Sequence, residues 1–500
     1  MILMLIILPA LAGLLAFFSP PASRVGALAK PGLRRGLLLA VSLAHAALVV
    51  ACWIRPPRPV LGGWLAIDAP GLLFLSITSG LFLMVSLHLI GYLGHEADHR
   101  ATDVEEGFLF NNAPEAIFIG CLLLFLAAMT LVTVSQHFGL LWVAIEATTL
   151  ASAPLIYFHR HHRSLEATWK YLLICSVGIA LALLGNFFLA VAATPPAQAG
   201  WPMLLSDLVT HAGQLQRPWL KAATLLLFVG YGTKMGLAPL HTWLPDAHGE
   251  APSAVSALLS GALLNCAFLG LVRMQQVCVA AGLTAFSQEV WLALGLVSLL
   301  VAALSILAQT DYKRLLAYSS VENMGLLAIG VGLGGVGIFG AMLQAVNHAL
   351  VKAMLFLLSG NILARSQSKT IADVRGLLTA APATGWLWIV GFLALCGLPP
   401  FGMFLSELTI LKAAFTGSHL WVAGLVLALL AVIFIRMIGV FPAMAQGRPE
   451  PRSLVPPPDR LWQILPPAIL GLAVLWLGVN IPAPLNHLLH QVTVTLGGAS

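Results

Sequence analysis

The chain has 500 residues, of which 59% are hydrophobic and only 9% are charged. Soluble globular proteins carry about 25% charged residues, so this chain has too little polar surface to cover a water-soluble particle of its size. The mean hydropathy of +0.94 agrees. Composition therefore excludes a soluble globular protein and predicts an all-α polytopic membrane protein.

The net charge of +6 does not indicate nucleic acid binding, because the basic residues lie mostly in short loops between apolar runs. None of the six cysteines forms a Cys-x-x-Cys pair, and most lie within apolar runs. Iron–sulfur and zinc sites need clustered thiolates. The chain also lacks a P-loop. We therefore expect no cofactor in this chain and no nucleic acid partner.

A membrane-spanning helix needs about 20 mostly apolar residues, and the sequence predicts fourteen. The apolar run that begins at Met1 lacks the basic region and cleavage site of a secretory signal, so we expect a retained helix. The predicted spans lie near residues 2–19, 36–54, 72–94, 114–134, 137–157, 167–193, 220–241, 252–279, 289–309, 313–332, 335–363, 384–409, 418–442 and 462–480.

The basic residues divide unevenly between the two sides of this arrangement. The loops after the first, third, fifth, ninth, eleventh and thirteenth spans hold sixteen of the 25 Lys and Arg residues, and the other loops hold six. The remaining three, Lys234, Lys352 and Arg436, lie within apolar segments. Cytoplasmic loops are rich in Lys and Arg, so we expect both termini on the non-cytoplasmic side of a bacterial-type inner membrane.

The seventh and twelfth spans carry prolines at positions where a helix should break. The seventh reads Lys-Met-Gly-Leu-Ala-Pro at 234–239, and the twelfth reads Cys-Gly-Leu-Pro-Pro-Phe-Gly at 396–402. A broken helix at membrane depth needs protein or a water-filled cavity to satisfy its freed backbone groups, and transporters place ion sites at such breaks. Proline kinks that serve packing alone are the alternative.

Two breaks five spans apart suggest an inverted repeat. We therefore divide the chain into N-terminal spans (1–112), a first five-helix repeat (113–280), a second five-helix repeat (281–443) and a C-terminal helix (444–500).

Ionisable residues at membrane depth are costly and usually functional. His348 and Lys352 are four residues apart and share one helix face. A lysine in an apolar setting binds its proton less tightly, and a nearby carboxylate reverses this effect. A series of such sites, bridged by water and histidine, would relay protons. The candidates at membrane depth are Glu146, Lys234, Glu322, His348, Lys352 and Glu407.

Several of these residues allow a structural interpretation. Glu322 and Glu407 lie near predicted helix ends and could be surface charges, and Lys352 could bind a backbone carbonyl for packing. His45 and His88 are interpreted as packing histidines.

A polar loop follows the first break and contains His241 and His248 within 241–250, His-Thr-Trp-Leu-Pro-Asp-Ala-His-Gly-Glu. Its spacing matches no trusted metal template. Helix capping or a loop that lines a proton entrance is the better interpretation, and His248 is kept as a candidate for the proton path.

Four ordered blocks resemble signatures of the antiporter-like subunits of complex I, a family that includes subunits of membrane-bound hydrogenases and of multisubunit sodium/proton antiporters. The resemblance covers nearly the whole chain. It implies a fourteen-helix fold with two inverted five-helix repeats. The blocks are 234–252, 311–320, 347–353 and 398–402.

The resemblance also implies roles for individual residues. Glu146 and Lys234 correspond to the family's first proton-channel pair, His348 and Lys352 to the histidine and lysine of the eleventh span, and Glu407 to the ionisable residue of the twelfth span.

Two positions depart from the common family pattern. Asn265 stands where many members have lysine, and Glu322 stands where many have histidine. The central relay should therefore differ, with His248 or water near Asn265 taking part. Both departures resemble the F component of hydrogenase-4-type complexes.

The sequence therefore predicts a proton-translocating membrane subunit of a hydrogenase-4-like or complex I-like oxidoreductase. We expect its partners to be other membrane subunits and a peripheral redox arm that holds iron–sulfur clusters with nickel–iron or flavin. The alternatives are a subunit of a cation/proton antiporter, a subunit of an energy-coupled inorganic carbon uptake complex, and a purely structural membrane anchor. Glu146 and Lys234 at membrane depth argue against the anchor.

Overall fold

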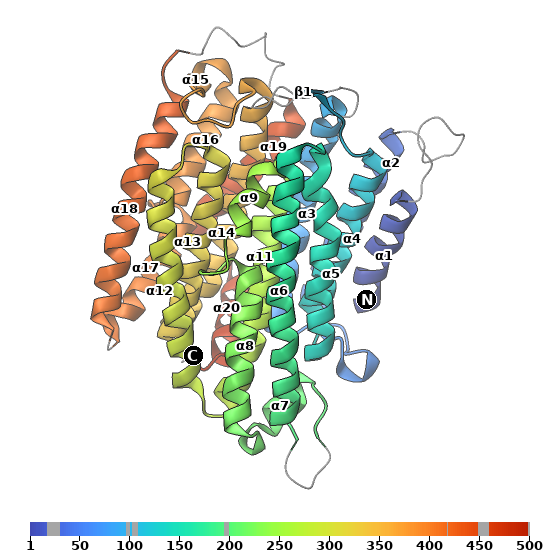
Figure 1. Ribbon diagram of the computed structural model, residues 1–500, viewed down its shortest axis with the longest axis vertical. Helices are drawn as coiled ribbons and strands as arrows, with labels where there is room; N and C mark the ends of the chain where they lie inside the picture. The colour runs from blue at the N-terminus through green and yellow to red at the C-terminus, as the bar shows by residue number, and fades with distance from the viewer. Residues whose placement is uncertain are drawn as a thin grey trace.

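The computed structural model describes residues 1–17, 31–96, 101–102, 109–194, 200–417, 419–448 and 460–498. It is a bundle of long helices that run roughly along one axis, with their connections gathered at the two ends (Figure 1). The predicted all-α membrane fold is confirmed. Among the described residues, eleven helices are long and apolar enough to cross a membrane.

The N-terminal part supplies three helices, and the predicted spans near 2–19, 36–54 and 72–94 fall on them. The last two residues of the first predicted span lie outside the described residues. The elements are α1 (Ile2–Phe17), α2 (Pro31–Ile54), η2 (Leu61–Gly63) and α3 (Ala69–Glu96), followed by an antiparallel pair of two-residue strands, β1 (Ala101–Thr102) and β2 (Leu109–Phe110).

The next part corresponds to the first predicted repeat. It contains α4 (Glu115–Val134), α5 (Phe138–Ile156), η3 (Tyr157–His159), α6 (His162–Ala192), α7 (Leu205–Thr210), η4 (Ala212–Gln214), α8 (Arg217–Met235), α9 (Trp243–Glu250), α10 (Ser253–Leu258), the π-helical segment η5 (Leu259–Leu263) and α11 (Leu264–Ala280).

The third part corresponds to the second predicted repeat and the C-terminal span. The amphipathic helix α20 is an addition that the hydropathy pattern did not predict. The elements are α12 (Thr284–Ala308), α13 (Tyr312–Leu333), α14 (Val336–Ser366), α15 (Leu377–Ala380), α16 (Pro382–Leu395), α17 (Gly402–Thr416), α18 (Leu420–Ala445), α19 (Leu461–Val479) and α20 (Ala483–Thr495).

Both predicted helix breaks are confirmed. Helix α8 ends at Met235, Gly236 adopts the left-handed conformation (φ 86°), and the next helix begins at Trp243. Helix α16 ends at Leu395, and α17 begins at Gly402 after a second left-handed glycine, Gly397 (φ 60°). The twelfth predicted span is therefore a pair of shorter helices, α16 with α17, and the seventh is α8 followed by the break, after which the short helix α9 begins. The repeat boundaries themselves stay predictions.

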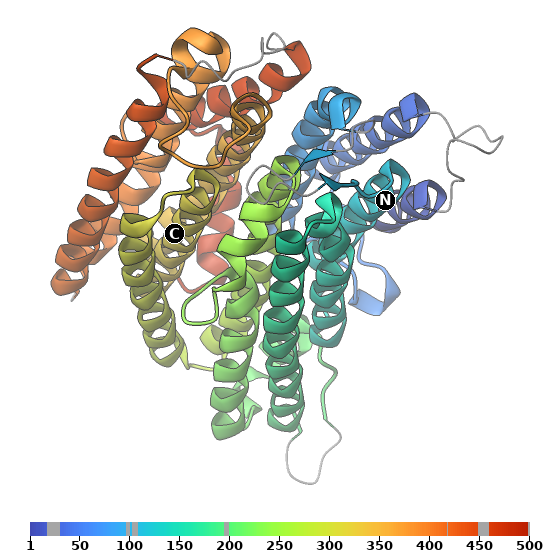
Figure 2. The same ribbon diagram turned by 45° about the horizontal axis from the view of Figure 1, so that its top comes forward.

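The two predicted repeats form neighbouring groups of helices in both views (Figures 1 and 2). Helix α9 lies between them and contacts α6 on one side and α13 on the other. The first break therefore brings a short helix of the first group into contact with the second group.

One residue departs from the topology argument. Arg273 is one of the six basic residues that the topology argument assigns to the other loops, although it falls inside the predicted span 252–279, and it lies within α11 and is only 1% exposed. Its guanidinium binds Asp68 (3.0 Å) and Gln136 (3.0 Å). Arg273 is therefore a buried partner of two other connections and not a marker of membrane side.

The close approach of α6 and α8 depends on facing glycines. A Cβ atom added at Gly230 would lie 2.6 Å from the carbonyl oxygen of Gly178 and 2.7 Å from Cβ of Ala182. Gly295 and Gly325 face each other in the same way between α12 and α13. Small residues at such crossings allow close backbone packing within a membrane.

We predict that Gly230→Ala lowers the melting temperature of the purified protein, because the new methyl group overlaps α6. Overpacking costs about 1–3 kcal/mol. Gly439→Ala is the matched control, since a Cβ at Gly439 meets nothing within 4 Å. Equal melting temperatures for Gly230→Ala and wild type would contradict the close α6–α8 contact.

Candidate functional site

The first cluster surrounds Lys234 in the last turn of α8. The side chain is 0% exposed, and its ammonium group donates hydrogen bonds to Oγ1 of Thr149 and to the hydroxyl of Tyr171, the latter over 3.1 Å. Thr149 in turn donates to Oε2 of Glu146 (3.0 Å). The structure therefore brings Glu146 and Lys234 together, but through a threonine hydroxyl and without a direct ion pair among the described residues.

The local sequence explains this arrangement. Glu146 and Thr149 are three residues apart on α5, so they share one face of the helix. The break after Met235 leaves Lys234 at the C-terminal end of α8, where a helix favours a positive charge. Trp243 closes the break by donating to the carbonyl of Thr233 (2.9 Å).

The second cluster surrounds Lys352 near the middle of α14. Its buried ammonium group donates to the carbonyl of Leu316 (2.7 Å) and to Oγ of Ser319, both on α13. It also interacts electrostatically with Glu322 and with His348. Like Lys234, this lysine is held by neutral polar groups and has a carboxylate nearby.

Two predicted histidines lie beside Lys352. His248 of α9 stacks on Phe356 of α14 with ring centroids 5.0 Å apart, and it interacts electrostatically with Lys352 and His348. His248 and His348 are both 0% exposed. Within the described part of the chain, neither ring of His248 or His348 has a hydrogen-bond partner. Unpaired imidazoles in a buried polar site are suited to accept a proton or a water molecule.

Glu322 and Glu407 border one small cavity of about 30 Å³ between α13, α16, α17 and α18, together with Cys396 and apolar residues of α18. This volume is enough to hold water. Glu322 is only 4% exposed, so it is not a surface charge. Glu407 is half-buried and interacts electrostatically with Glu322. The cavity is therefore a place where two carboxylates can exchange a proton through water.

The departure at Asn265 also lies in the interior. Its side chain is 1% exposed and donates to the carbonyl of Gly261 (2.8 Å), within the π-helical segment Leu259–Leu263. Its Oδ1 atom has no hydrogen-bond partner among the described residues. Ser260 of the same segment bonds Ser320 of α13 (2.8 Å). Polar side chains are thus present between the Lys234 and Lys352 clusters. They lie at a π-helical segment, and such segments are frequent at functional sites.

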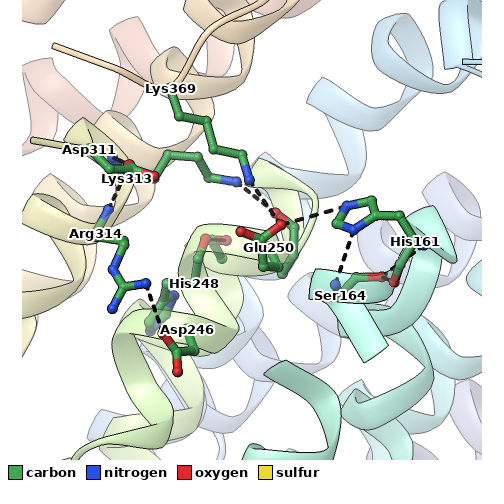
Figure 3. Close-up of polar contacts among 11 residues, drawn as sticks. His161, Ser164, Asp246, His248, Glu250, Asp311, Lys313, Arg314 and Lys369 are labelled. Atoms are coloured by element: carbon green, nitrogen blue, oxygen red, sulfur yellow. Dashed lines mark hydrogen bonds and ion pairs between the residues drawn. The ribbon is translucent and has the colours of Figure 1, made fainter. Parts of the chain in front are cut away.

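The short helix α9 is fixed by two carboxylates on one face. Asp246 binds Lys170 of α6 and Arg314 of α13, each at 3.0 Å. In Figure 3, Arg314 reaches Asp246 on the side of α9 away from His161. Asp246 therefore forms an ion pair with one basic side chain from each predicted repeat.

Glu250, four residues further on, repeats this pattern. It binds Lys369, from the segment after α14, at 2.9 Å and His161, at the start of α6, at 3.6 Å (Figure 3). Lys313 of α13 adds a hydrogen bond to the carbonyl of Ala251 (2.7 Å). These contacts hold α9, and with it His248, between the two predicted repeats.

Sequence reasoning missed the residues that hold the two lysines. Thr149 could have been found from its spacing to Glu146, since both lie on one face of α5. Tyr171 and Ser319 lie on other helices, and although Ser319 belongs to the block 311–320, its contact with Lys352 depends on how α13 and α14 pack. Among the described residues, no group of three or more His, Cys, Asp or Glu side chains is placed to hold a metal ion.

The fold and the buried lysine clusters define a membrane subunit of the ion-translocating kind. Residues 135–433 match the family NADH:quinone oxidoreductase/Mrp antiporter, TM. The chain belongs to this family, as the sequence motifs predicted.

Two relatives match over most of their length. A hydrogenase-4 component F homolog of Methylacidiphilum infernorum is 36% identical over 403 residues, which are 79% of this chain and 83% of the relative. NADH-quinone oxidoreductase subunit N of Desulforudis audaxviator is 29% identical over 494 residues, which are 95% of this chain and 94% of the relative.

Solved structures share the fold. A chain of the membrane-bound sulfane sulfur reductase, an archaeal respiratory membrane complex, superposes with a TM-score of 0.85 at 21% identity, covering 99% of this chain and 97% of that one. A chain of the Mrp complex from Dietzia sp. DQ12-45-1b gives 0.82 at 19% identity, covering 99% and 96%. Both likenesses show the fold that this chain shares with those membrane subunits.

We predict that acid destabilises the protein partly through Glu250. Burial raises the pKa of Glu250, but Lys369, aided by Arg163 and Lys313, outweighs burial and holds the pKa below its ordinary value of 4.5. A carboxyl group with a lowered pKa in the folded state stabilises the protein above its unfolded pKa, and this stabilisation is lost as the pH falls through the folded pKa.

Glu250→Gln should lower the melting temperature near pH 7, since it leaves Lys369 half-buried without its carboxylate, at a cost of about 1–3 kcal/mol. The difference between variant and wild type should shrink as the pH falls below 4.5. Thermal unfolding between pH 3.5 and pH 7.5 measures both effects. Asp207→Asn in α7 is a control without these ion pairs. A difference that does not change with pH would contradict the role given to the Glu250 charge.

Proposed function

We propose that this chain moves protons across the membrane as a subunit of a hydrogenase-4-like or related complex I-like oxidoreductase. The observation that carries the proposal is the Lys234 cluster. A fully buried ammonium group has two neutral hydroxyls as its hydrogen-bond acceptors in the described structure, and one of them leads to a carboxylate. Such a charge at membrane depth is costly and is kept where it has a function.

The hydrogen bonds give the direction of one transfer. Lys234 donates to Thr149, and Thr149 donates to Glu146. When Lys234 passes its proton to the oxygen of Thr149, the hydroxyl proton of Thr149 passes to Glu146. One O–H bond forms as another breaks, so the threonine is unchanged. A neutral lysine and a protonated carboxyl group result, so one positive charge has moved from Lys234 to Glu146 while the total charge of the pair is unchanged.

The Lys352 cluster supports a second transfer site of the same kind. His248 of the first predicted repeat lies beside His348 of the second, and Glu322 and Glu407 share a cavity with room for water. Six of the seven candidate residues of the sequence prediction are thus buried or border the cavity, and the seventh, Glu146, is half-buried. We assign to them the path Glu146, Lys234, His248, His348, Lys352, Glu322 and Glu407.

The wider context of this function is also a proposal. The 36% identity to a hydrogenase-4 component F homolog supports a hydrogenase-4-like complex. Partner subunits would then carry the redox cofactors in a peripheral arm, and other membrane subunits would flank this chain. The basic loops support a bacterial-type inner membrane with both termini outside the cytoplasm. The two helix breaks support inverted repeats at 113–280 and 281–443.

A cation/proton antiporter subunit is the second candidate, and the likeness to a chain of the Mrp complex favours it. The two candidates differ in their partners. An oxidoreductase complex purified through this chain should contain iron–sulfur clusters that are visible by their absorption, and an antiporter complex should not.

We predict that Thr149→Val slows proton translocation about tenfold or more while leaving assembly intact, because hydrogen bonds to a charged group contribute about 1.5–3 kcal/mol. Lys234→Ala and Glu146→Ala should abolish most translocation, and the double variant should be little worse than either one, since residues that act as a unit are not additive. Thr210→Val, at an exposed position of α7, is the control for the loss of a hydroxyl.

Proton uptake into vesicles that contain the whole complex measures these rates. A Lys234→Ala complex that assembles fully and translocates at the wild-type rate would refute the proposed function.

A further inference from the structure

A series of hydrogen bonds between buried polar groups lies beside the second lysine cluster. The hydroxyl of Ser406 on α17 donates to Oε1 of Gln344 on α14. Nε2 of Gln344 donates to Oδ1 of Asn323 on α13 (2.7 Å), and Nδ2 of Asn323 donates to the backbone carbonyl of Ser319 (2.7 Å). Ser406, Gln344 and Asn323 are at most 1% exposed. These groups, which we call the Gln344 network, therefore join three helices inside the bundle.

The carbonyl of Ser319 fixes the orientation of every group in the Gln344 network. A carbonyl only accepts, so the amide nitrogen of Asn323 faces Ser319 and its amide oxygen faces Gln344. Gln344 then presents its nitrogen to Asn323 and its oxygen to Ser406, which must donate. Neutral amide groups donate and accept hydrogen bonds in this way without giving up a proton. The network is therefore suited to hold helices in position and not to carry protons.

Gln344 bridges the residues that adjoin two of the proposed proton carriers. Asn323 follows Glu322 on α13, and Ser406 precedes Glu407 on α17. Glu322 and Glu407 border the same small cavity. One glutamine side chain thus connects the two helices that carry these carboxylates, within one residue of each of them.

The Gln344 network also reaches the other two candidates of the second predicted repeat. Asn347, which precedes His348, donates to Oγ of Ser406 (3.4 Å). Ser319, whose carbonyl ends the network, accepts a hydrogen bond from Lys352 at its hydroxyl. Hydrogen bonds of neighbouring residues therefore link the positions of all four candidates on α13, α14 and α17.

Apolar packing brings α17 close to α14 but does not fix its rotation. A Cβ atom at Gly340 of α14 would lie 3.0 Å from the backbone nitrogen of Ile410 and 3.2 Å from the carbonyl oxygen of Ser406. Apolar contact is not directional, so it allows small rotations and shifts along the helix axis. Hydrogen bonds weaken steeply with misalignment, and a satisfied buried network favours one arrangement. Directional bonds to Gln344 therefore fix the rotation of α17 relative to α13 and α14.

Helix α17 needs this hold because the second break separates it from α16. Two side chains lie directly against the glycines of that break. A Cβ atom at Gly397 would overlap Oε2 of Glu407, and a Cβ atom at Gly402 would overlap Oδ1 of Asn347. The carboxyl group of Glu407 thus packs on the break itself, where a movement of α17 changes its position.

We propose that Gln344 is a positioning residue of the proton path, whose two hydrogen bonds hold Glu407 at the cavity that it shares with Glu322. The inference rests on the proposed function, since it needs these two carboxyl groups to exchange protons. Gln344 itself takes no proton. Without its bonds α17 is free to shift, the separation of the two carboxyl groups varies, and transfer slows because it depends steeply on geometry.

The test replaces Gln344 with two side chains of similar size and measures proton translocation by the whole complex in vesicles. Gln344→Met removes both hydrogen bonds. Gln344→Glu keeps them, because a carboxyl group buried away from water is neutral; its O–H donates to Asn323 and its carbonyl accepts from Ser406. We expect Gln344→Met to lower the rate per assembled complex about tenfold or more, and Gln344→Glu to stay close to the wild-type rate. A merely structural role would make the buried acid the worse variant.

Gln275→Met is the matched control. Gln275 of α11 is also 0% exposed, and its Oε1 accepts a hydrogen bond from Trp291 (3.1 Å), outside the Gln344 network. Methionine at this position also removes a buried hydrogen bond, so it measures that loss alone, and we expect the wild-type rate per assembled complex. A wild-type rate in Gln344→Met, an equal loss in Gln344→Glu or an equal loss in Gln275→Met would refute the positioning role.

Lys234→Ala separates this inference from the proposed function. If Lys234→Ala stops translocation but Gln344→Met translocates at the wild-type rate, the positioning role is refuted and the proposed function stands. If Lys234→Ala also translocates at the wild-type rate, both are refuted. If Gln344→Met does not assemble, Ser406→Ala and Ser406→Thr decide. Loss of translocation in alanine with recovery in threonine supports the positioning role, and any other pattern refutes it.

Discussion

The structure depends on one constraint, which is that a charge inside a membrane must be held by polar groups of the protein itself. Water is not there to solvate it, and each unsatisfied polar group costs several kcal/mol. Lys234 and Lys352 meet this constraint in the same way, through hydroxyls and a carbonyl of neighbouring helices. The helix breaks, the hydroxyl residues on α5 and α13 and the close glycine crossings all serve to bring those groups within reach.

The same constraint explains the position of α9. A short helix released by the break after α8 carries His248 into the space between the two predicted repeats, next to Lys352. Its two carboxylates lie near the end of the bundle, where solvent reaches some of their basic partners. The helix thus has a buried polar residue on one side and charged anchors on the other.

The sequence was sufficient to predict what depends on composition and on local pattern. Hydropathy located the spans, and the prolines at 239 and 399–400 located both breaks. Buried lysines and glutamates stood out because charge is rare in apolar runs. Pattern could not predict that Thr149 lies between Glu146 and Lys234, or that Ser319 and the Leu316 carbonyl bind Lys352. Those contacts depend on the rotation and depth of helices that are far apart in the chain.

Arg273 shows a second limit of prediction from sequence, which is that burial of a charged residue depends on contacts between distant segments. Counting basic residues near span ends treats each as solvated, and the count placed Arg273 in a loop. Its burial depends on Asp68 and Gln136, which come from two other connections. A rule based on charge and sequence position cannot distinguish a loop cation from one that three segments enclose.

The two anchors of α9 differ in how much water surrounds them, and ionic strength should therefore act on them unequally. Lys170 and Arg314, the partners of Asp246, have side chains 46% and 42% exposed, whereas Lys369 and Glu250 are 13% and 16% exposed. Salt weakens ion pairs that are exposed to solvent and affects buried pairs much less. Added salt would weaken the ion pairs of Asp246 before those of Glu250. The end of α9 at Asp246 would therefore move more easily than the end at Glu250.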